Sequence, residues 1–197
     1  MSKSIAFFDF DGTVTKRDTM LEFAKFCAGK SAYLSGMLQI SPWLIAMKCK
    51  LVSKQVAKEK LLTHFFGGMN LQHFNEKCRQ FTDACMPSLI KDEAMAAITL
   101  HKEAKRPIVV VSASAENWVA PWCEQNGFIC IASRLQVVGD KVTGKLLGAN
   151  CNGKEKVSRI NEMFSVADFE NIYCYGDTGG DKEMLAMASH PFFRCYK

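Results

Sequence analysis

Two aspartates stand directly after an apolar run near the N-terminus. The run Ile5–Phe8 leads into Asp9, Phe10 and Asp11. Side chains two apart on a strand point the same way, so both carboxylates are expected to leave the end of a buried strand on one side. At about 4 Å two carboxylates repel by roughly 4 kcal/mol at an effective dielectric constant near 20, so the pair needs a positive partner. A divalent cation such as Mg²⁺, which usually accompanies a phosphate group, is the predicted partner.

A plain turn is the alternative explanation for this pair. Gly12 follows Asp11, and two solvated aspartates beside a glycine are typical of a strand-to-loop turn. Two later segments favour a chemical role instead. The apolar run 108–111 ends at Ser112, and the run 171–175 leads to Asp177 and, four residues on, to Asp181. Open α/β sheets bind ligands at the carboxyl ends of their strands, so these side chains are expected to meet at one edge.

The segments around these runs predict a Rossmann-like α/β fold with a parallel sheet. Residues 14–90 carry helical patterns and almost no strand signal, whereas strand and helix alternate after them. We therefore expect a core domain of residues 1–13 and 91–197, with a helical cap domain of residues 14–90 inserted after the first strand. The expected helices span 19–28, 32–51, 53–66, 71–85, 92–105, 115–126, 155–165 and 180–188; the expected strands span 108–111, 129–132, 171–175 and 192–194, with a hairpin of 135–138 and 142–143.

Composition points to a compact enzyme in a reducing compartment. The chain has 197 residues, 48% of them hydrophobic, which is enough for one sizeable core. Its formal charge is only +5 and its basic residues are mostly scattered, so no nucleic-acid partner is expected. Nine cysteines without a Cys-x-x-Cys pair are typical of reduced thiols. The first strand starts too early to leave room for a cleaved signal peptide, so a cytoplasmic location is expected.

The order of the motifs resembles that of the haloacid dehalogenase superfamily of phosphohydrolases. Asp-x-Asp-Gly-Thr, a serine after a strand, a lysine at a helix start and Gly-Asp-x-x-x-Asp follow one another over nearly the whole chain. The stretches 8–19, 111–118 and 175–185 are most similar to the subfamily of phosphoserine phosphatase and the phosphatidylglycerophosphatase-type enzymes. The resemblance implies a phosphatase that uses Mg²⁺ and an aspartyl-phosphate intermediate.

Phosphoryl transfer assigns a role to each aspartate. Asp9 is expected to be the nucleophile, and Asp11 the general acid and base that protonates the leaving alcohol and then activates water. The resemblance implies the same roles and adds the backbone carbonyl of Asp11 as a metal ligand beside Asp9. Asp177 is expected to complete the metal shell. Asp181 would support it directly or through water, or else cap the final helix.

Neutral donors and one ammonium complete the expected site. Thr13 and Ser112 suit phosphate oxygens, although Ser112 alone would equally suit a helix N-cap. The family needs one lysine to neutralise phosphate and nucleophile together. Lys156 fits the Gly-x-x-Lys-Val spacing and is preferred, while Lys154 fits the shorter spacing of the phosphoserine phosphatases.

The cap leaves the substrate open. Asp18 resembles the acidic residue that holds the amino-acid head group in phosphoserine phosphatases, but Arg17 and Arg79 do not match the cap arginine of those enzymes. The apolar segment 33–47 is expected to be cap core or a dimer contact, with a membrane interface as the alternative. We expect a monomer or homodimer acting on a small phosphorylated metabolite. A lipid-phosphate phosphatase and a phosphotransferase or mutase are the alternatives.

Overall fold

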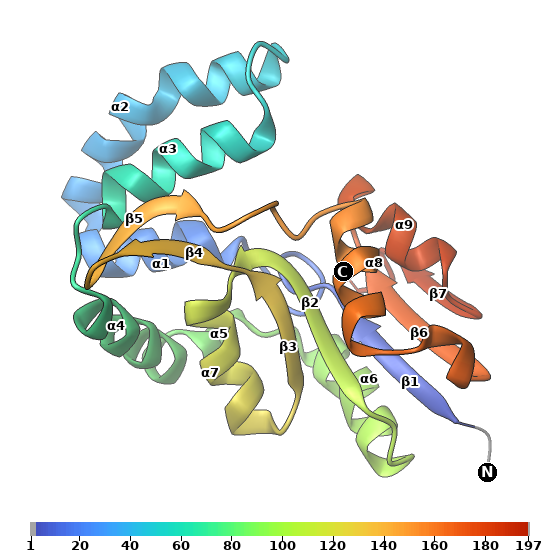
Figure 1. Ribbon diagram of the computed structural model, residues 1–197. Helices are drawn as coiled ribbons and strands as arrows, with labels where there is room; N and C mark the ends of the chain where they lie inside the picture. The colour runs from blue at the N-terminus through green and yellow to red at the C-terminus, as the bar shows by residue number, and fades with distance from the viewer. Residues whose placement is uncertain (1–2, 197) are drawn as a thin grey trace.

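A five-stranded parallel sheet forms the centre of the computed structural model, which describes residues 3–196 (Figure 1). The order is β3-β2-β1-β6-β7, and each neighbouring pair runs parallel, which confirms the predicted fold class. Because β1 is the middle strand, the residue after it lies at the centre of the carboxyl edge. The strands are β1 (Ser4–Phe8), β2 (Ile108–Ala115), β3 (Ile129–Ser133), β6 (Asn171–Gly176) and β7 (His190–Phe193).

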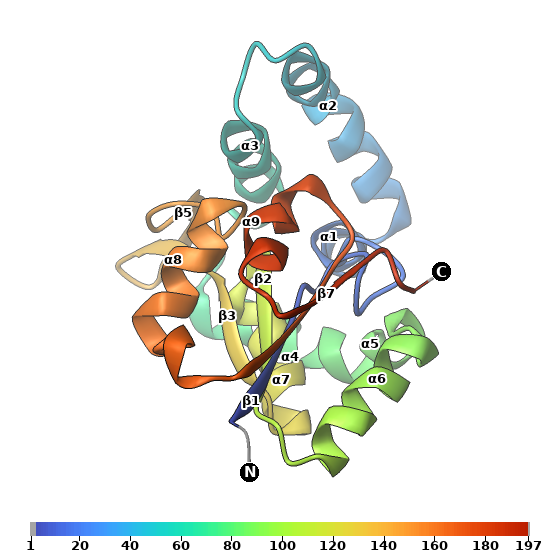
Figure 2. The same cartoon turned by 90° about the vertical axis from the view of Figure 1, so that its right-hand side faces the viewer.

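Helices cover both faces of this sheet (Figures 1 and 2). On one face Phe8 and Val110 belong to a buried cluster with Trp118 of α7 (Glu116–Asn126) and with Ile98 of α6 (Asp92–Glu103). On the other face Phe7 and Val109 pack with α8 (Lys154–Met163) and α9 (Lys182–Ala186). Consecutive residues of β1 therefore point to opposite layers of helices, as the alternation of side chains along a strand requires. Both faces of the sheet are buried.

The segment 14–90 divides between two places. Helices α1 (Thr19–Ala28), α4 (Leu71–Ala84) and α5 (Met86–Leu89) lie near the sheet layers, whereas α2 (Lys30–Lys48) and α3 (Lys54–Phe66) project beyond them (Figure 1). Aromatic side chains connect the projecting helices with the helices near the sheet. The centroid of the Phe23 ring in α1 lies 5.0–5.6 Å from the centroids of four other aromatic rings. These are Phe66, Phe74, Phe81 and Trp118. A separate cap domain of residues 14–90 stays a proposal, and α2 with α3 is its projecting part.

The apolar segment 33–47 lies within α2 and has two kinds of side chain. Gly36 and Ile40 are buried, whereas Leu34, Leu38 and Ile45 are 59%, 74% and 60% exposed. None of the helices described between residues 3 and 196 has the length and apolar character needed to cross a bilayer.

Two of the differences from the sequence-based expectation affect the edge of the sheet that follows β2 and β6. β2 continues to Ala115, four residues further than expected, so Ser112 and Ser114 both lie on its final part. The expected final helix is divided into a 3₁₀ turn, Gly179–Asp181, and the short α9. Thr178 and Asp181 form a capping box that satisfies backbone N–H groups at the start of the turn.

A hairpin of β4 (Leu135–Val138) and β5 (Lys141–Leu146) supports α3 from the core side. At Gly144 a Cβ atom would overlap the backbone of Thr63, so only glycine permits this close approach. The hairpin thereby sets the position of α3, one of the two projecting helices.

Gly144→Ala should separate the hairpin from α3. The backbone φ of Gly144 is 81°, and that of Gly148 is 84° with open space around it, so Gly148→Ala carries similar backbone strain without the overlap. We expect Gly144→Ala to lower the free energy of unfolding by about 2 kcal/mol more than Gly148→Ala, measured by urea denaturation. Equal losses in the two variants would contradict the account of this contact.

Candidate active site

The nucleophile candidate lies where the sheet topology places it. Asp9 follows β1, and its backbone N–H donates to the carbonyl of Tyr175 in β6, at 2.9 Å. Asp177 follows β6, so both aspartates leave the carboxyl edge of neighbouring strands. Gly12 closes the turn after Asp9 with a φ of 86°, and a Cβ atom there would overlap the carboxylate of Asp177.

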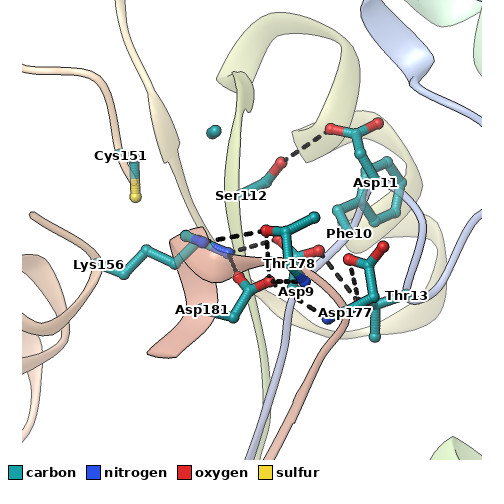
Figure 3. Close-up of polar contacts among 12 residues, drawn as sticks. Asp9, Phe10, Asp11, Thr13, Ser112, Cys151, Lys156, Asp177, Thr178 and Asp181 are labelled. Atoms are coloured by element: carbon teal, nitrogen blue, oxygen red, sulfur yellow. Dashed lines mark hydrogen bonds and ion pairs between the residues drawn. The ribbon is translucent and has the colours of Figure 1, made fainter. Parts of the chain in front are cut away.

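Lys156 is buried between two carboxylates (Figure 3). Its Nζ lies 2.5 Å from Oδ1 of Asp9 and 2.6 Å from Oδ1 of Asp181, and the side chain is 1% exposed. Lys156 occupies the first turn of α8, immediately after the turn at Gly153. Lys154, the alternative lysine, is exposed. The structure thus brings Lys156 to the nucleophile candidate and leaves Lys154 at the surface.

Three carboxylates gather around this lysine. Oxygens of Asp9, Asp177 and Asp181 all lie within 4.8 Å of one another. Thr13 Oγ1 is 3.2 Å from both Asp9 Oδ2 and Asp177 Oδ1, so it can donate to either oxygen. With one ammonium among three carboxylates, the cluster carries excess negative charge. Hard oxygen ligands with such a charge fit Mg²⁺.

Burial makes the charged form of Asp9 costly. It raises the pKa of Asp9 to about 7, against the opposing attraction of Lys156. Burial also favours the neutral form of Asp181, but the ion pair with Lys156 and the bonds from Thr178 hold its pKa below the usual value. A cation near Asp9 would favour the ionised carboxylate, which is the form a nucleophile needs.

Asp181 also organises the loop that carries Asp177. Its Oδ2 accepts hydrogen bonds from the backbone N–H groups of Asp177 and Thr178, and from the Thr178 hydroxyl, at 2.9–3.2 Å. Since Oδ1 pairs with Lys156, both oxygens are engaged within the protein. Asp181 thus belongs to the capping box of the 3₁₀ turn and makes no side-chain cap to α9, and its support of a metal stays a prediction.

Asp11 points to a different part of the site. Oδ1 accepts from the backbone N–H and the hydroxyl of Thr19, both at 2.6 Å, and Oδ2 accepts from Ser114 Oγ at 2.6 Å. The carboxylate is absent from the acidic cluster in residues 3–196, whose members are Asp9, Asp177 and Asp181. Strand β1 ends at Phe8, so the following turn separates the two side chains that strand spacing would have placed together.

Two further expected residues lie behind or beside the site. Ser112 is fully buried; it accepts from the Ser114 backbone N–H at 2.9 Å and lies 3.5 Å from Asp11 Oδ2 (Figure 3). Asp18 caps α1 by accepting from the N–H groups of Met20 and Leu21. Ser112 and Asp18 therefore lie near Asp11 and are not members of the acidic cluster.

Two side chains beside Asp11 were not among the expected site residues. Ser114 donates to Asp11 Oδ2, because β2 continues beyond Ser112 and carries Ser114 to this carboxylate. Lys58 of α3 reaches the end of β2, where Nζ donates to the carbonyl of Ala113 and, at 3.0 Å, to Asn150 Oδ1. Lys58 stands among other lysines in the sequence, so only the packing of α3 distinguishes it.

Asp9→Asn should change how stability depends on pH in metal-free buffer. Asp9 binds its proton up to about pH 7 in the folded state, but only to about pH 3.8 when unfolded, so its contribution to stability falls as pH rises through this interval. We expect the variant to gain on the order of 3 kcal/mol relative to wild type between about pH 4 and pH 8, measured by urea denaturation. A stability difference that is the same at both pH values would contradict the burial of Asp9.

Comparisons with known proteins agree with this arrangement. The model of the haloacid dehalogenase-like hydrolase family matches residues 6–186. The chain is 34% identical over 192 residues to protein CicA of Caulobacter vibrioides, covering 96% of this chain and 85% of CicA. It is 27% identical to a probable phosphatase of Mycobacterium tuberculosis, covering 96% and 68%.

A solved structure supports the same fold. A substrate-bound phosphoserine phosphatase complex superimposes with a TM-score of 0.71 at 17% identity, covering all of this chain and 88% of that one. The family match spans the strand before Asp9, Lys156 and the Asp177–Asp181 loop, which are the parts that build the acidic cluster. The chain therefore belongs to the haloacid dehalogenase-like hydrolases.

Proposed function

We propose that the protein is a Mg²⁺-dependent phosphomonoester hydrolase that acts through an aspartyl-phosphate on Asp9. One observation carries the proposal: the Asp9 carboxylate lies beside the buried ammonium of Lys156, and oxygens of Asp177 and Asp181 lie within 4.8 Å of an oxygen of Asp9. The relative from Mycobacterium tuberculosis described as a probable phosphatase supports this reaction class. A small phosphorylated metabolite is the proposed substrate.

Asp9 and Asp11 would divide the reaction into two displacements. A carboxylate oxygen of Asp9 attacks phosphorus, the P–O bond to the alcohol breaks, and Asp11 supplies a proton to the leaving oxygen. In the second displacement water attacks phosphorus, Asp11 takes its proton, and inorganic phosphate leaves Asp9 free. Thr19 and Ser114 hold the Asp11 carboxylate at the cavity wall between these proton transfers.

Lys156 and the metal would together neutralise the negative charge of the phosphoryl group. The ammonium contacts Asp9 and is shielded from water, so its charge acts strongly on both nucleophile and phosphate oxygens. Mg²⁺, when bound, would add a second positive charge opposite these oxygens. Asp9, Asp177 and the backbone carbonyl of Asp11 are its proposed ligands, with Asp181 in support. Thr13 and Ser112 are proposed phosphate-side donors.

We propose the cell compartment and the assembly state that are expected from the sequence. All nine cysteines, which lie within the described residues, are unpaired, and this supports a cytoplasmic location. A monomer or homodimer without a nucleic-acid partner remains the proposed state, and Asp18 remains a proposed contact for the substrate.

Phosphate release from a panel of phosphomonoesters tests this function. Chelation of divalent ions should abolish hydrolysis and Mg²⁺ should restore it, while Ca²⁺ should substitute poorly because its coordination is larger and looser. Asp9→Asn should lower kcat by at least about 1,000-fold.

A lysine pair supplies the matched control. Lys156→Met should lower kcat by about 100-fold or more, whereas Lys154→Met removes an exposed neighbour on the same helix and should leave the rate within about twofold. Undiminished hydrolysis after full chelation, or an Asp9→Asn rate within about tenfold of wild type, would overturn the proposed function.

A further inference from the structure

A cavity of about 440 Å³ leads from the catalytic edge to the projecting helices. Asp9, Asp11 and Asp181 line one part of it, side chains of α1, α2 and α3 line another, and Ser114, Asn150, Asn152 and Thr178 are further members of the lining. This volume is within the range of small-ligand sites. The part of the substrate beyond the phosphate must therefore lie against α1, α2 and α3.

The wall formed by these helices is mainly apolar. Its apolar members, contributed by all three helices, include Leu21, Met37, Leu44, Met47 and Leu61, and Lys54 and Lys58 of α3 are its charged members. Leu38, by contrast, lies on the same helix as Leu44 but is 74% exposed and does not line the cavity. Helix α2 thus presents one set of apolar side chains to the cavity and another to the outside.

Two charged groups between this wall and the acidic cluster have partners within the protein. The Asp18 carboxylate caps α1, and Lys58 donates two of its three protons to the Ala113 carbonyl and to Asn150. Among the described residues, the cavity lining includes lysines but no arginine. A zwitterionic head group would have to displace these contacts, because a buried charge without a partner is costly.

We propose that this cavity selects a phosphomonoester whose leaving group is an apolar chain, with the chain packed against Leu21, Met37, Leu44, Met47 and Leu61. This inference rests on the proposed function for the orientation of the phosphate toward Asp9. Lys58 is a positioning residue: its bonds to Ala113 and Asn150 tie α3, and with it Leu61, to the edge of the sheet. Its third proton is available to an oxygen next to the ester bond.

Binding of alkylphosphonates, which the enzyme cannot hydrolyse as esters, tests the cavity separately from the reaction. In Mg²⁺ buffer the Kd measured by calorimetry should fall by about fourfold for each methylene added from propyl- to octylphosphonate, until the cavity is full. Hydrolysis of the matching alkyl phosphates should show the same trend in kcat/KM and should exceed that of phosphoserine. A Kd that does not depend on chain length, or a preference for phosphoserine, would overturn the inference.

Two leucines of α2 provide the matched variants. Leu44→Asn, which places an amide in the cavity wall, should weaken octylphosphonate binding by about tenfold or more and change propylphosphonate binding by less than about twofold. Leu38→Asn, on the exposed side, should change neither. Equal effects of the two substitutions would contradict the proposed wall. If no phosphomonoester is hydrolysed but the chain-length trend in Kd is present, the proposed function fails and the apolar cavity stands.

Apolar phosphomonoesters occur as free amphiphiles and as membrane lipids. A hydrolysis assay with two forms of one substrate distinguishes these sources. Lysophosphatidic acid with a short chain is supplied either dispersed below its micelle concentration or embedded in phosphatidylcholine vesicles. Faster hydrolysis of the dispersed form identifies a free amphiphile, and faster hydrolysis of the embedded form identifies a lipid surface; both support the apolar cavity. Hydrolysis of phosphoserine with neither form accepted would overturn it.

Discussion

The ion pair of Lys156 with Asp9 and Asp181 is the interaction on which the rest of the site depends. All three side chains are largely removed from water, and a buried charge is tolerated only when paired and hydrogen-bonded. Each partner comes from a different part of the chain: the end of β1, the first turn of α8 and the turn after β6. The charges can meet only when the sheet and α8 are correctly assembled.

The charged groups at this edge of the sheet are held by ion pairs and hydrogen bonds, whereas the cavity beyond them is lined mainly by apolar side chains. Asp181 uses both oxygens to hold Lys156 and the Asp177 loop, and Asp11 is held by Thr19 and Ser114. The helices above the cavity contribute mostly aliphatic side chains, which supply shape and dryness but little polar recognition. The proposed chemistry and the proposed substrate selection thus depend on different side chains of one cavity.

Sequence patterns were sufficient for the groups at the ends of regular elements. Asp9 and Asp177 follow apolar strands, and the sheet topology then places them at one edge. Their exact partners depend on turns that no pattern reveals. The turn after Phe8 directs Asp11 toward Thr19 instead of keeping it beside Asp9.

Long-range packing accounts for what the sequence could not show. Ser114 enters the site because β2 runs four residues beyond its apolar core, and Lys58 enters because Gly144 lets the hairpin approach α3. The cavity wall is spread over three helices, and α2 and α3 also carry exposed apolar side chains. Which apolar side chains form this wall therefore depends on the position of α2 and α3 relative to the carboxyl edge of the sheet, which no local sequence pattern determines.

The central claim is that Asp9 carries the phosphoryl group, and direct detection of that adduct tests it most directly. In the Asp11→Asn variant the second displacement lacks its base, whereas p-nitrophenyl phosphate releases its alcohol without an acid. Acid-quenched reaction of this pair, followed by peptide mass spectrometry, should show phosphate on the peptide that contains Asp9. Release of inorganic phosphate without any covalent phosphate on that peptide, or phosphate on another residue, would contradict the account.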